Sequence, residues 1–422
     1  IANAVGGAIR ASNNSNDIHR AFSINLTADG DIGTTATPFK TDTSYLAAYA
    51  KDGGINISNS SFDASASPLA LILGAIKTTQ ISNGIALTAV DDGNGNIRLV
   101  DGSQGTKDII INTVGNLVLT DTINATRNLS LNAGGAIQTS GRLTNGVMVL
   151  PTLTAVKFSA TAAGDIGLAA QAIKTNIENV TANTTNGGVF LSEQNGLRRA
   201  DITATKDISL NADTGDIVLG ALTTQKQQTN NSVTTATKAT VSSKKGAILA
   251  ATTNPAATNI QAGELDISTL SSIGTANNNI KTNVDRVKLS NTSTVSSVSS
   301  HINNASALKS IDASVRGTNA LVKFANNGQL SFDATTGKLK LVGGLGETLN
   351  FTNDSSAAAT QNIVLDGITL GSEQKLTLSA TGSVNQSGTT PTIAKEITIT
   401  AGKGIGTNQA LSTQTKKATL TS

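Results

Sequence analysis

The sequence predicts an all-β fold in which short strands stack into a solenoid. Three observations support this prediction. Apolar residues alternate with polar ones around glycine turns, segments of the same kind recur along the chain, and nearly all large apolar side chains are aliphatic. A solenoid escapes the size limit of a single compact core because its core is a line. All 422 residues can therefore belong to one elongated rod.

The clearest strand pattern lies within residues 128–167. Three apolar residues spaced by two precede a glycine pair, and the same arrangement returns after Lys375. Spacing of two gives a strand one apolar face, and the glycine pair supplies a corner between strands. The apolar residues are Leu129, Leu131 and Ala133 in the first copy, and Leu376, Leu378 and Ala380 in the second.

A second recurring segment joins an Ile-Gly pair to a short stretch that contains threonine or serine. It reads GDIGTTATPFKT from Gly30, GDIGLAAQAIKT from Gly164, SIGTANNNIKT from Ser272 and GIGTNQALST from Gly404. The intervals between these segments are long and irregular, so each must hold several strand-turn-strand units. If one coil takes about 20 residues, the chain makes about 20 coils. At about 4.8 Å per coil, the rod is about 100 Å long.

The pattern also divides the chain. Residues 1–20 predict a poorly defined N-terminal coil or linker, and residues 21–422 predict a continuous β-helix. The run at 69–76 fits either a buried strand or a short helical cap, because periodicity alone does not separate the two. Three segments poor in large aliphatic residues predict outward excursions. They fit a low-hydrophobicity face of the same coil, a flexible excursion or a partner-binding protrusion. They lie near 223–245, 290–310 and 352–361.

Charge and composition exclude several functional classes. The chain has 31 basic and 28 acidic residues and no run of more than two Lys or Arg, so we expect no nucleic-acid binding. The absence of Cys excludes disulfides, thiolate metal sites and cysteine nucleophiles. No stretch approaches the roughly 20 apolar residues of a membrane span, and no leader precedes Ile1. We expect an internal or processed piece of a longer protein.

Few residues are candidates for chemistry. His19 and His301 are the only histidines, lie in polar surroundings and are expected to be exposed. Their spacing supports no Ser-His-Asp triad. Enzymes that cleave polysaccharides also use β-helices, but they need paired carboxylates at a set separation, or calcium with a basic proton acceptor, on one strand face. The adjacent Asp91 and Asp92 would point to opposite faces, and no suitable basic residue follows them. A flat threonine face that binds ice or carbohydrate would need Thr-x-Thr at a constant period, which the sequence does not show.

A partial calcium-loop motif begins at Asp92. Asp92, Asn94 and Asn96 occupy ligand positions, but Ile97 stands where the loop needs Gly and Ser103 where it needs Glu. We interpret this segment as a plain turn. The sequence therefore predicts no catalytic, cofactor-binding or metal-binding residues, no cofactor and no enzymatic activity.

The segments DISLNADTGDIVLG and NLSLNAGGAIQTSG, together with the GDIG segments, resemble the β-helical passengers of bacterial filamentous-haemagglutinin-type exoproteins and related large surface adhesins. The resemblance covers residues 21–422 and concerns a style of repeat. It implies a single-stranded, right-handed parallel β-helix that is secreted by the two-partner route and exported unfolded.

The family resemblance also implies a function and partners. The expected function is that of a stalk or adhesive fibre on the cell surface, for attachment, cell-cell contact or biofilm. The expected partners are an outer-membrane transporter during export, a glycan or protein receptor on a host cell, a bacterial surface or the matrix, and further copies that join end to end or laterally. A subunit of a self-assembling filament is the alternative, followed by a polysaccharide-acting β-helix enzyme.

Overall fold

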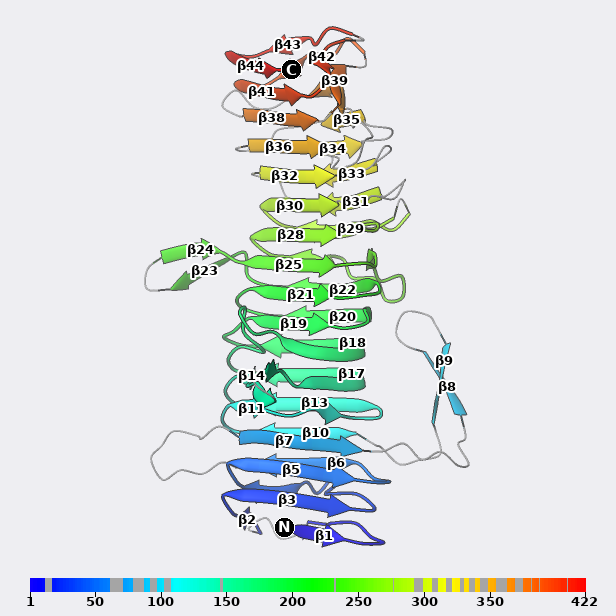
Figure 1. Ribbon diagram of the computed structural model, residues 1–422, viewed down its shortest axis with the longest axis vertical. Helices are drawn as coiled ribbons and strands as arrows, with labels where there is room; N and C mark the ends of the chain where they lie inside the picture. The colour runs from blue at the N-terminus through cyan, green and yellow to red at the C-terminus, as the bar shows by residue number, and fades with distance from the viewer. Residues whose placement is uncertain are drawn as a thin grey trace. The chain divides into compact units, whose positions relative to one another are not determined.

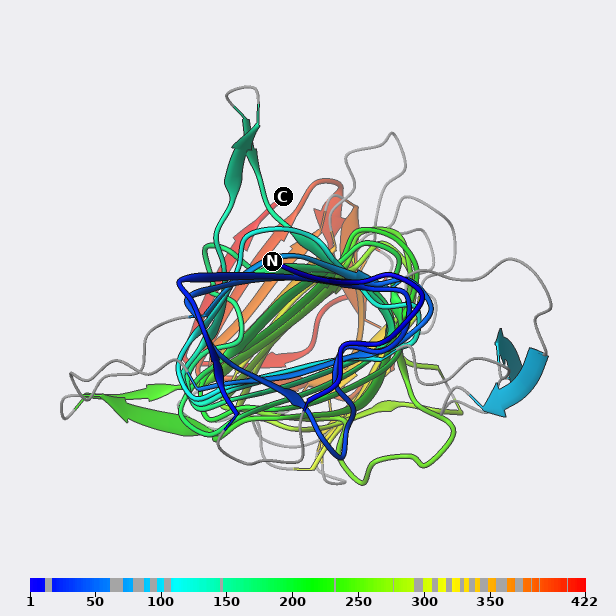
Figure 2. The same ribbon diagram turned by 90° about the horizontal axis from the view of Figure 1, so that it is seen from below.

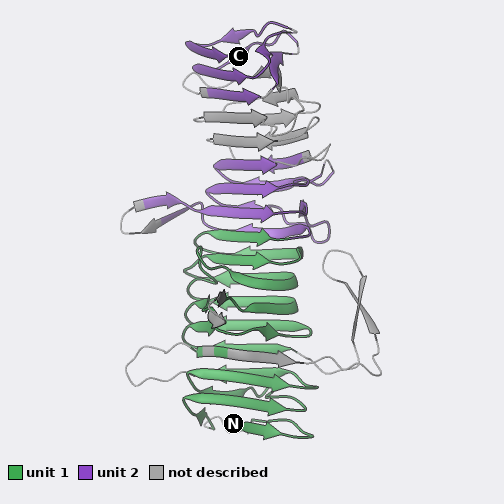
Figure 3. Ribbon diagram, in the orientation of Figure 1, with its two compact units in different colours: residues 1–213 green, residues 214–422 purple. Residues whose placement is uncertain are grey.

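The computed structural model describes most of the chain and divides it into two compact units, Ile1–Asp213 and Thr214–Ser422 (Figure 3). All regular secondary structure among the described residues is β-strand. The described residues are 1–11, 17–60, 71–78, 87–91, 97–101, 108–144, 147–230, 233–275, 277–291, 299–305, 310–315, 321–326, 330–333, 338–341, 348–353, 363–368, 375–380, 382–386, 388–407 and 409–422.

The first unit is a parallel β-solenoid. Its strands run around the coil in sequence, and each pairs in parallel with a strand of the next coil (Figure 1). The stacked strands are β1 (Ala2–Ala4), β2 (His19–Arg20), β3 (Ser23–Ala28), β4 (Phe39–Asp42), β5 (Tyr45–Ala50), β6 (Ile55–Asn59), β7 (Leu71–Thr78), β10 (Ile109–Thr113), β11 (Leu117–Leu119), β12 (Ile123–Asn124), β13 (Asn128–Ala133), β14 (Ile137–Thr139), β17 (Thr152–Ala162), β18 (Ile173–Thr184), β19 (Val189–Glu193), β20 (Leu197–Thr203) and β21 (Ile208–Ala212).

The second unit is built in the same way. One column of eight strands, β25, β28, β30, β32, β36, β38, β41 and β44, pairs in parallel from coil to coil. Its strands are β22 (Ile217–Thr223), β25 (Lys238–Ser243), β26 (Ile248–Ala250), β27 (Ile260–Gln261), β28 (Glu264–Thr269), β29 (Ile280–Asn283), β30 (Arg286–Asn291), β31 (Ser299–Asn304), β32 (Ser310–Val315), β33 (Leu321–Asn326), β34 (Leu330–Asp333), β35 (Lys338–Leu341), β36 (Thr348–Asn353), β37 (Ile363–Ile368), β38 (Lys375–Ala380), β39 (Ser383–Gln386), β40 (Thr392–Ile393), β41 (Glu396–Ala401), β42 (Gly404–Ile405), β43 (Thr413–Gln414) and β44 (Lys417–Thr421).

Alternating apolar residues explain the solenoid core. In β13, Leu129 and Leu131 point inward and are fully buried, while Ser130 between them lies on the outer face. The parallel register places aliphatic side chains of neighbouring coils next to each other. For example, Ile57, Ile111 and Leu131 occupy successive coils of one inner column. Burying these side chains in a continuous line supplies the main stabilisation of the fold. The predicted all-β solenoid is therefore confirmed.

The coil length differs from the expected 20 residues. Paired residues are 19 apart at Val189 and Ile208 (208 − 189) but 54 apart at Ile55 and Ile109 (109 − 55). In the second unit, Ser310 pairs with Thr348, 38 residues later (348 − 310). The estimate of about 20 coils is thus too high, because many coils contain more residues than the shortest ones do.

Hairpins account for part of this additional chain. Each is an antiparallel two-stranded sheet that pairs only with itself among the described strands. In Figure 2, β15–β16 and β23–β24 each project away from the stacked strands of their own unit. The hairpins are β8 (Leu87–Asp91) with β9 (Ile97–Asp101), β15 (Arg142–Thr144) with β16 (Val147–Val149), and β23 (Gln227–Asn230) with β24 (Val233–Ala236).

The expected excursions overlap these hairpins in part. The segment near 223–245 contains β23–β24, but its end forms β25, which belongs to the main stack. The segments near 290–310 and 352–361 contribute β31 and the end of β36 to the stack, and residues 292–298, 306–309 and 354–361 lie outside the described part.

Two ambiguous segments near the N-terminus contribute strands. Within residues 1–20, β1 pairs with β3 and β2 with β4. In the run at 69–76, residues from Leu71 onward form β7, which pairs in parallel with β5, so the helical alternative is wrong there.

Candidate functional site

The recurring Ile-Gly pairs form a corner of the coil. All four glycines adopt the left-handed backbone conformation, with φ of 64° at Gly33, 74° at Gly167, 62° at Gly274 and 66° at Gly406. A Cβ atom on Gly33 would lie 2.3 Å from the carbonyl oxygen of Asn56 in the next coil. Only glycine meets both requirements, which explains why the pair recurs in the sequence.

An aspartate precedes two of these corner isoleucines, Ile32 and Ile166, and another precedes Ile217; each of the three links one coil to the next. In each case one carboxylate oxygen accepts a hydrogen bond from a backbone N–H of the following coil. The pairs are Asp31 with Gly54 (2.8 Å), Asp165 with Gly188 (2.7 Å) and, at Ile217, Asp216 with Ala247 (2.7 Å). The aspartate therefore satisfies a backbone donor that would otherwise lack a partner at the turn.

The last threonine of three of the four recurring segments makes a second link between coils. Its hydroxyl donates to a buried side chain of the next coil, and that side chain also accepts from the backbone N–H two residues after the threonine. The hydroxyl pairs are Thr41 with Asn59 (2.8 Å), Thr175 with Glu193 (2.7 Å) and Thr282 with Asn304 (2.8 Å). We call this arrangement the threonine corner.

Glu193 is the chemically unusual member of this set. It is fully buried. Burial raises the pKa of its carboxyl group above the ordinary value, and hydrogen bonds from Thr175, Asn195 and Ile177 partly oppose that shift. No cleft adjoins this carboxyl group among the described pockets. Its contacts are those of a structural acid at a corner.

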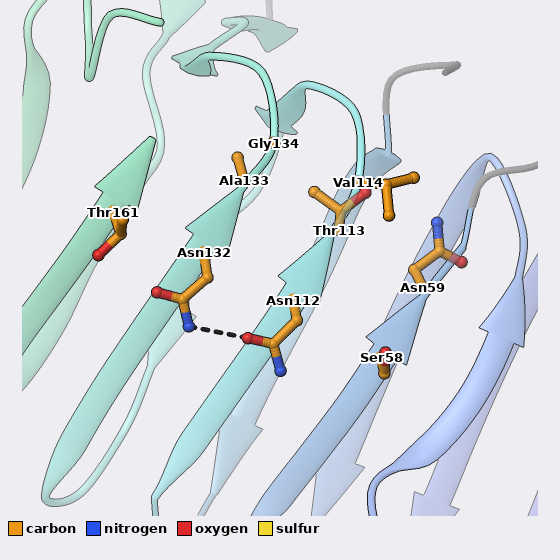
Figure 4. A pocket seen from close by; sticks show the side chains of 9 residues that line it. All are labelled: Ser58, Asn59, Asn112, Thr113, Val114, Asn132, Ala133, Gly134 and Thr161. Carbon is orange, nitrogen blue, oxygen red and sulfur yellow. Dashed lines mark hydrogen bonds between the residues drawn. The ribbon is translucent and has the colours of Figure 1, made fainter. Parts of the chain in front are cut away.

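A hollow of about 310 Å³ lies at the ends of β6, β10 and β13 and beside β17 (Figure 4). Ser58, Asn112, Asn132 and Thr161 occupy one register column across these four strands. Asn132 donates from Nδ2 to Oδ1 of Asn112 at 2.8 Å, so the Asn112 amide nitrogen and the Asn132 amide oxygen stay available to a ligand. The remaining lining residues are Asn59, Thr113, Val114, Ala133 and Gly134.

Serine and threonine share one register column of the second unit. Parallel pairing places a serine or threonine at the same register position in eight successive strands. They are Ser242, Ser268, Ser290, Ser314, Thr352, Ser379, Thr400 and Thr421. Sequence reasoning missed this column because its members are 21 to 38 residues apart, and only the register of the coils aligns them.

The two histidines differ in exposure. His19 is exposed, as expected, and stacks on Phe39 with ring centroids 4.5 Å apart. The expected exposure of His301 is wrong: it is 3 % exposed, because its strand carries it beside the corner at Gly274. The turn at Asp92, Asn94 and Asn96 lies outside the described residues.

Comparison with known proteins does not assign the chain. No family model, no curated protein and no solved structure matches it. Within the described residues, His, Cys, Asp and Glu side chains form no group of three or more that could hold a metal ion. The same part of the chain contains no helix long and apolar enough to cross a membrane.

Proposed function

We propose that this chain is a structural and adhesive segment of a secreted or cell-surface bacterial exoprotein, in which it serves as a stalk or fibre for attachment. The parallel coil-to-coil register within each unit carries the proposal. A solenoid of this kind lengthens by adding coils and leaves the contacts of earlier coils unchanged. It suits a spacer or fibre, whose function depends on extended surface.

The outer faces support a role in contact with other surfaces. Asn112 and Asn132 hold their amides side by side, and the second unit places serine or threonine at one register position of eight strands. Such groups match the hydroxyls of glycans and the backbone of proteins. The expected partner is a glycan or protein receptor on a host cell, another bacterium or the extracellular matrix, and the filamentous-haemagglutinin-like resemblance points the same way.

The architecture also suits export as an unfolded chain. Each coil that emerges from an outer-membrane transporter can stack on the coil before it, because most contacts join neighbouring coils. The chain has no Cys, so its folding does not depend on disulfide formation after export.

A bead assay tests adhesion directly. Beads coated with the chain should bind epithelial cells, bacterial cells or immobilised matrix more strongly than albumin-coated beads do. A double variant, Asn112→Ala with Asn132→Ala, tests whether the hollow takes part, and Ser23→Ala, at an exposed position that does not line the hollow, is its control. Binding at the albumin level on all three surfaces would refute an adhesive role.

Negative-stain electron microscopy across a dilution series separates the alternatives. Particles of constant size support a stalk segment, whereas fibres that persist on dilution support a self-assembling filament. Release of reducing sugar from bacterial or host polysaccharides would instead favour a polysaccharide-acting enzyme, and would contradict the proposed structural role.

A further inference from the structure

The β23–β24 hairpin has two strand edges without a neighbouring strand. Its strands pair with each other, and among the described strands neither pairs with a third. Strands of the stack differ: β28, for example, pairs with β25 on one edge and with β30 on the other. The hairpin also projects away from the stacked strands of its own unit (Figure 2). An unpaired edge of this kind is a template on which a further strand can pair.

The base of the hairpin is fixed to the stack. The backbone N–H of Thr237 donates to the Lys226 carbonyl at 3.2 Å, which joins the two ends of the hairpin. The hydroxyl of Thr237 accepts from the backbone N–H of Gly263 in the next coil at 3.3 Å. Thr237 is fully buried at this junction. The hairpin is therefore presented from a defined position on the second unit, which lowers the entropic cost of pairing its edge with a partner.

The two lysines that flank the hairpin in sequence form ion pairs with the stack. Nζ of Lys226 lies 2.8 Å from Oδ1 of Asp285, and Nζ of Lys238 lies 2.9 Å from Oδ2 of Asp266. Proteins commonly protect a strand edge with charged side chains, lysine above all, or with proline. Residues 227–237, between the two lysines, contain no charged residue, no Pro and no Gly. The hairpin edges therefore lack the usual protection against strand pairing.

The other two described hairpins contain charged residues in their strands. They are Asp91, Arg98 and Asp101 in β8–β9, and Arg142 in β15–β16. The strands of β23–β24 instead consist of Gln, Thr, Asn, Val and Ala. A short neutral segment of this composition, without Pro or Gly, is typical of strands that pair with copies of themselves. The lack of charge is thus a property of this hairpin and is not shared by all hairpins of the chain.

The exposed side chains of β24 favour a second copy of this chain as the partner. Thr234, Thr235 and Ala236 are all exposed. Threonines opposite each other stabilise antiparallel strands, whereas a charged partner strand would meet no opposite charge here. A twofold axis perpendicular to the sheet pairs two identical strands antiparallel and centres the contact on one residue. In such a pair, Thr234 or Thr235 lies opposite the same residue of the second copy.

We propose that β24 pairs antiparallel with β24 of a second copy of this chain. The contact joins the two hairpins into one continuous antiparallel sheet. Isolated two-stranded hairpins are only marginally stable in water, so the additional strand pairing stabilises both hairpins. A twofold contact is closed, so it produces a dimer. The dimer joins two copies laterally and does not require a receptor. The bead assay for adhesion and a test of dimerisation can therefore fail independently of each other.

Sedimentation velocity of the full chain over a dilution series tests the contact. The wild type should form a species of twice the single-chain mass that dissociates on dilution. Thr234→Lys with Thr235→Lys places like charges opposite each other, whichever of the two positions lies at the centre, and should remove the dimer. Thr234→Glu with Thr235→Glu should do the same. An equimolar mixture of the two double variants should restore the dimer, because lysine then lies opposite glutamate. Misfolding would not be reversed by mixing.

Thr398→Lys with Thr400→Lys is the matched control. Both threonines are exposed, but their strand, β41, pairs with β38 on one edge and β44 on the other. This variant should dimerise like the wild type, and circular dichroism shows whether each variant folds. The proposal is overturned if the wild type stays a single chain at every concentration up to its solubility limit. It is also overturned if the folded lysine variant of β24 dimerises like the wild type, or if the equimolar mixture contains only single chains.

Discussion

Glu193 accepts a 2.7 Å hydrogen bond from the hydroxyl of Thr175, at a corner where two other coils place an asparagine. The asparagines, Asn59 and Asn304, also donate from Nδ2 to backbone carbonyls, each at 3.1 Å. An ionised Glu193 cannot donate. The glutamate corner therefore carries an electrostatic cost that the asparagine corners avoid, and the chain tolerates it inside a fully buried position.

The first prediction concerns this corner. Burial raises the folded-state pKa of Glu193 above its unfolded value, so the folded state holds the proton more tightly. The contribution of Glu193 to stability is fully present below the unfolded pKa and is lost as pH rises through the folded pKa. Glu193→Gln should therefore raise the urea midpoint at pH 7 and have little effect at pH 4.

The matched control for this prediction is Asp207→Asn, which removes an acid whose side chain is not fully buried. It should not reproduce the pH-dependent gain. Urea midpoints of the wild type and both variants, measured between pH 4 and pH 7, test this prediction. Equal effects of Glu193→Gln at both ends of this range would show that the carboxyl group titrates normally in the folded protein.

The second prediction concerns the corner glycine. In Gly33→Ala, the alanine must adopt a φ of 64° and place its methyl group 2.3 Å from the Asn56 carbonyl oxygen. The substitution should therefore lower the free energy of unfolding by about 3 kcal/mol or more. Gly6→Ala separates the two causes, since Gly6 has a φ of 71° but no atom within 4 Å of the position that its Cβ would take. It should cost only about 1–2 kcal/mol. Similar urea midpoints for the two variants would refute the clash between coils.

Much of this architecture could be predicted from the sequence. Alternation in segments such as Leu129 to Ala133 indicates strands because a spacing of two places these apolar side chains on one face of a strand, where they can be buried together. The recurring Ile-Gly pairs are recognisable as landmarks in the sequence, and their backbone conformation explains that recurrence.

The remaining features depend on which residues pair between coils, and this register cannot be read from the sequence. The distance between paired residues varies from 19 to 54, so sequence spacing cannot show that Asp31 and Asp108 share a column. For the same reason the burial of His301 could not be predicted: a polar neighbourhood in sequence indicates nothing about the coil stacked beside it. Coil-to-coil contacts create both features.

The third prediction concerns the inner column. Ile111 is fully buried between Ile57 and Leu131, so Ile111→Ala leaves a cavity that neighbouring coils cannot fill and should cost about 2–5 kcal/mol. Val114, three residues away, has a side chain that is 55 % exposed. Val114→Ala should therefore change the free energy of unfolding by less than about 0.5 kcal/mol. Urea unfolding of both variants checks this difference, and an unchanged midpoint for Ile111→Ala would place that residue outside the core.

The fourth prediction concerns the β23–β24 hairpin. Its strands pair only with each other among the described residues, and the backbone N–H of Thr237 donates to the Lys226 carbonyl at 3.2 Å, which closes the base of the hairpin. Replacing residues 227–236 with Asn-Gly should therefore keep the solenoid, with a change of no more than about 0.5 kcal/mol.

Deletion of β28 (Glu264–Thr269) is the control for the hairpin excision. This strand pairs in parallel with both β25 and β30, so its removal breaks two ladders and two buried rows at once. It should abolish cooperative folding of the second unit, seen as loss of the β signal in circular dichroism.

If the hairpin excision were equally damaging, the projecting hairpin would have to stabilise the stack through contacts beyond its own pairing. If instead both deletions were tolerated, the continuous register could not be the source of stability, because a solenoid transmits its stabilisation only through neighbouring coils.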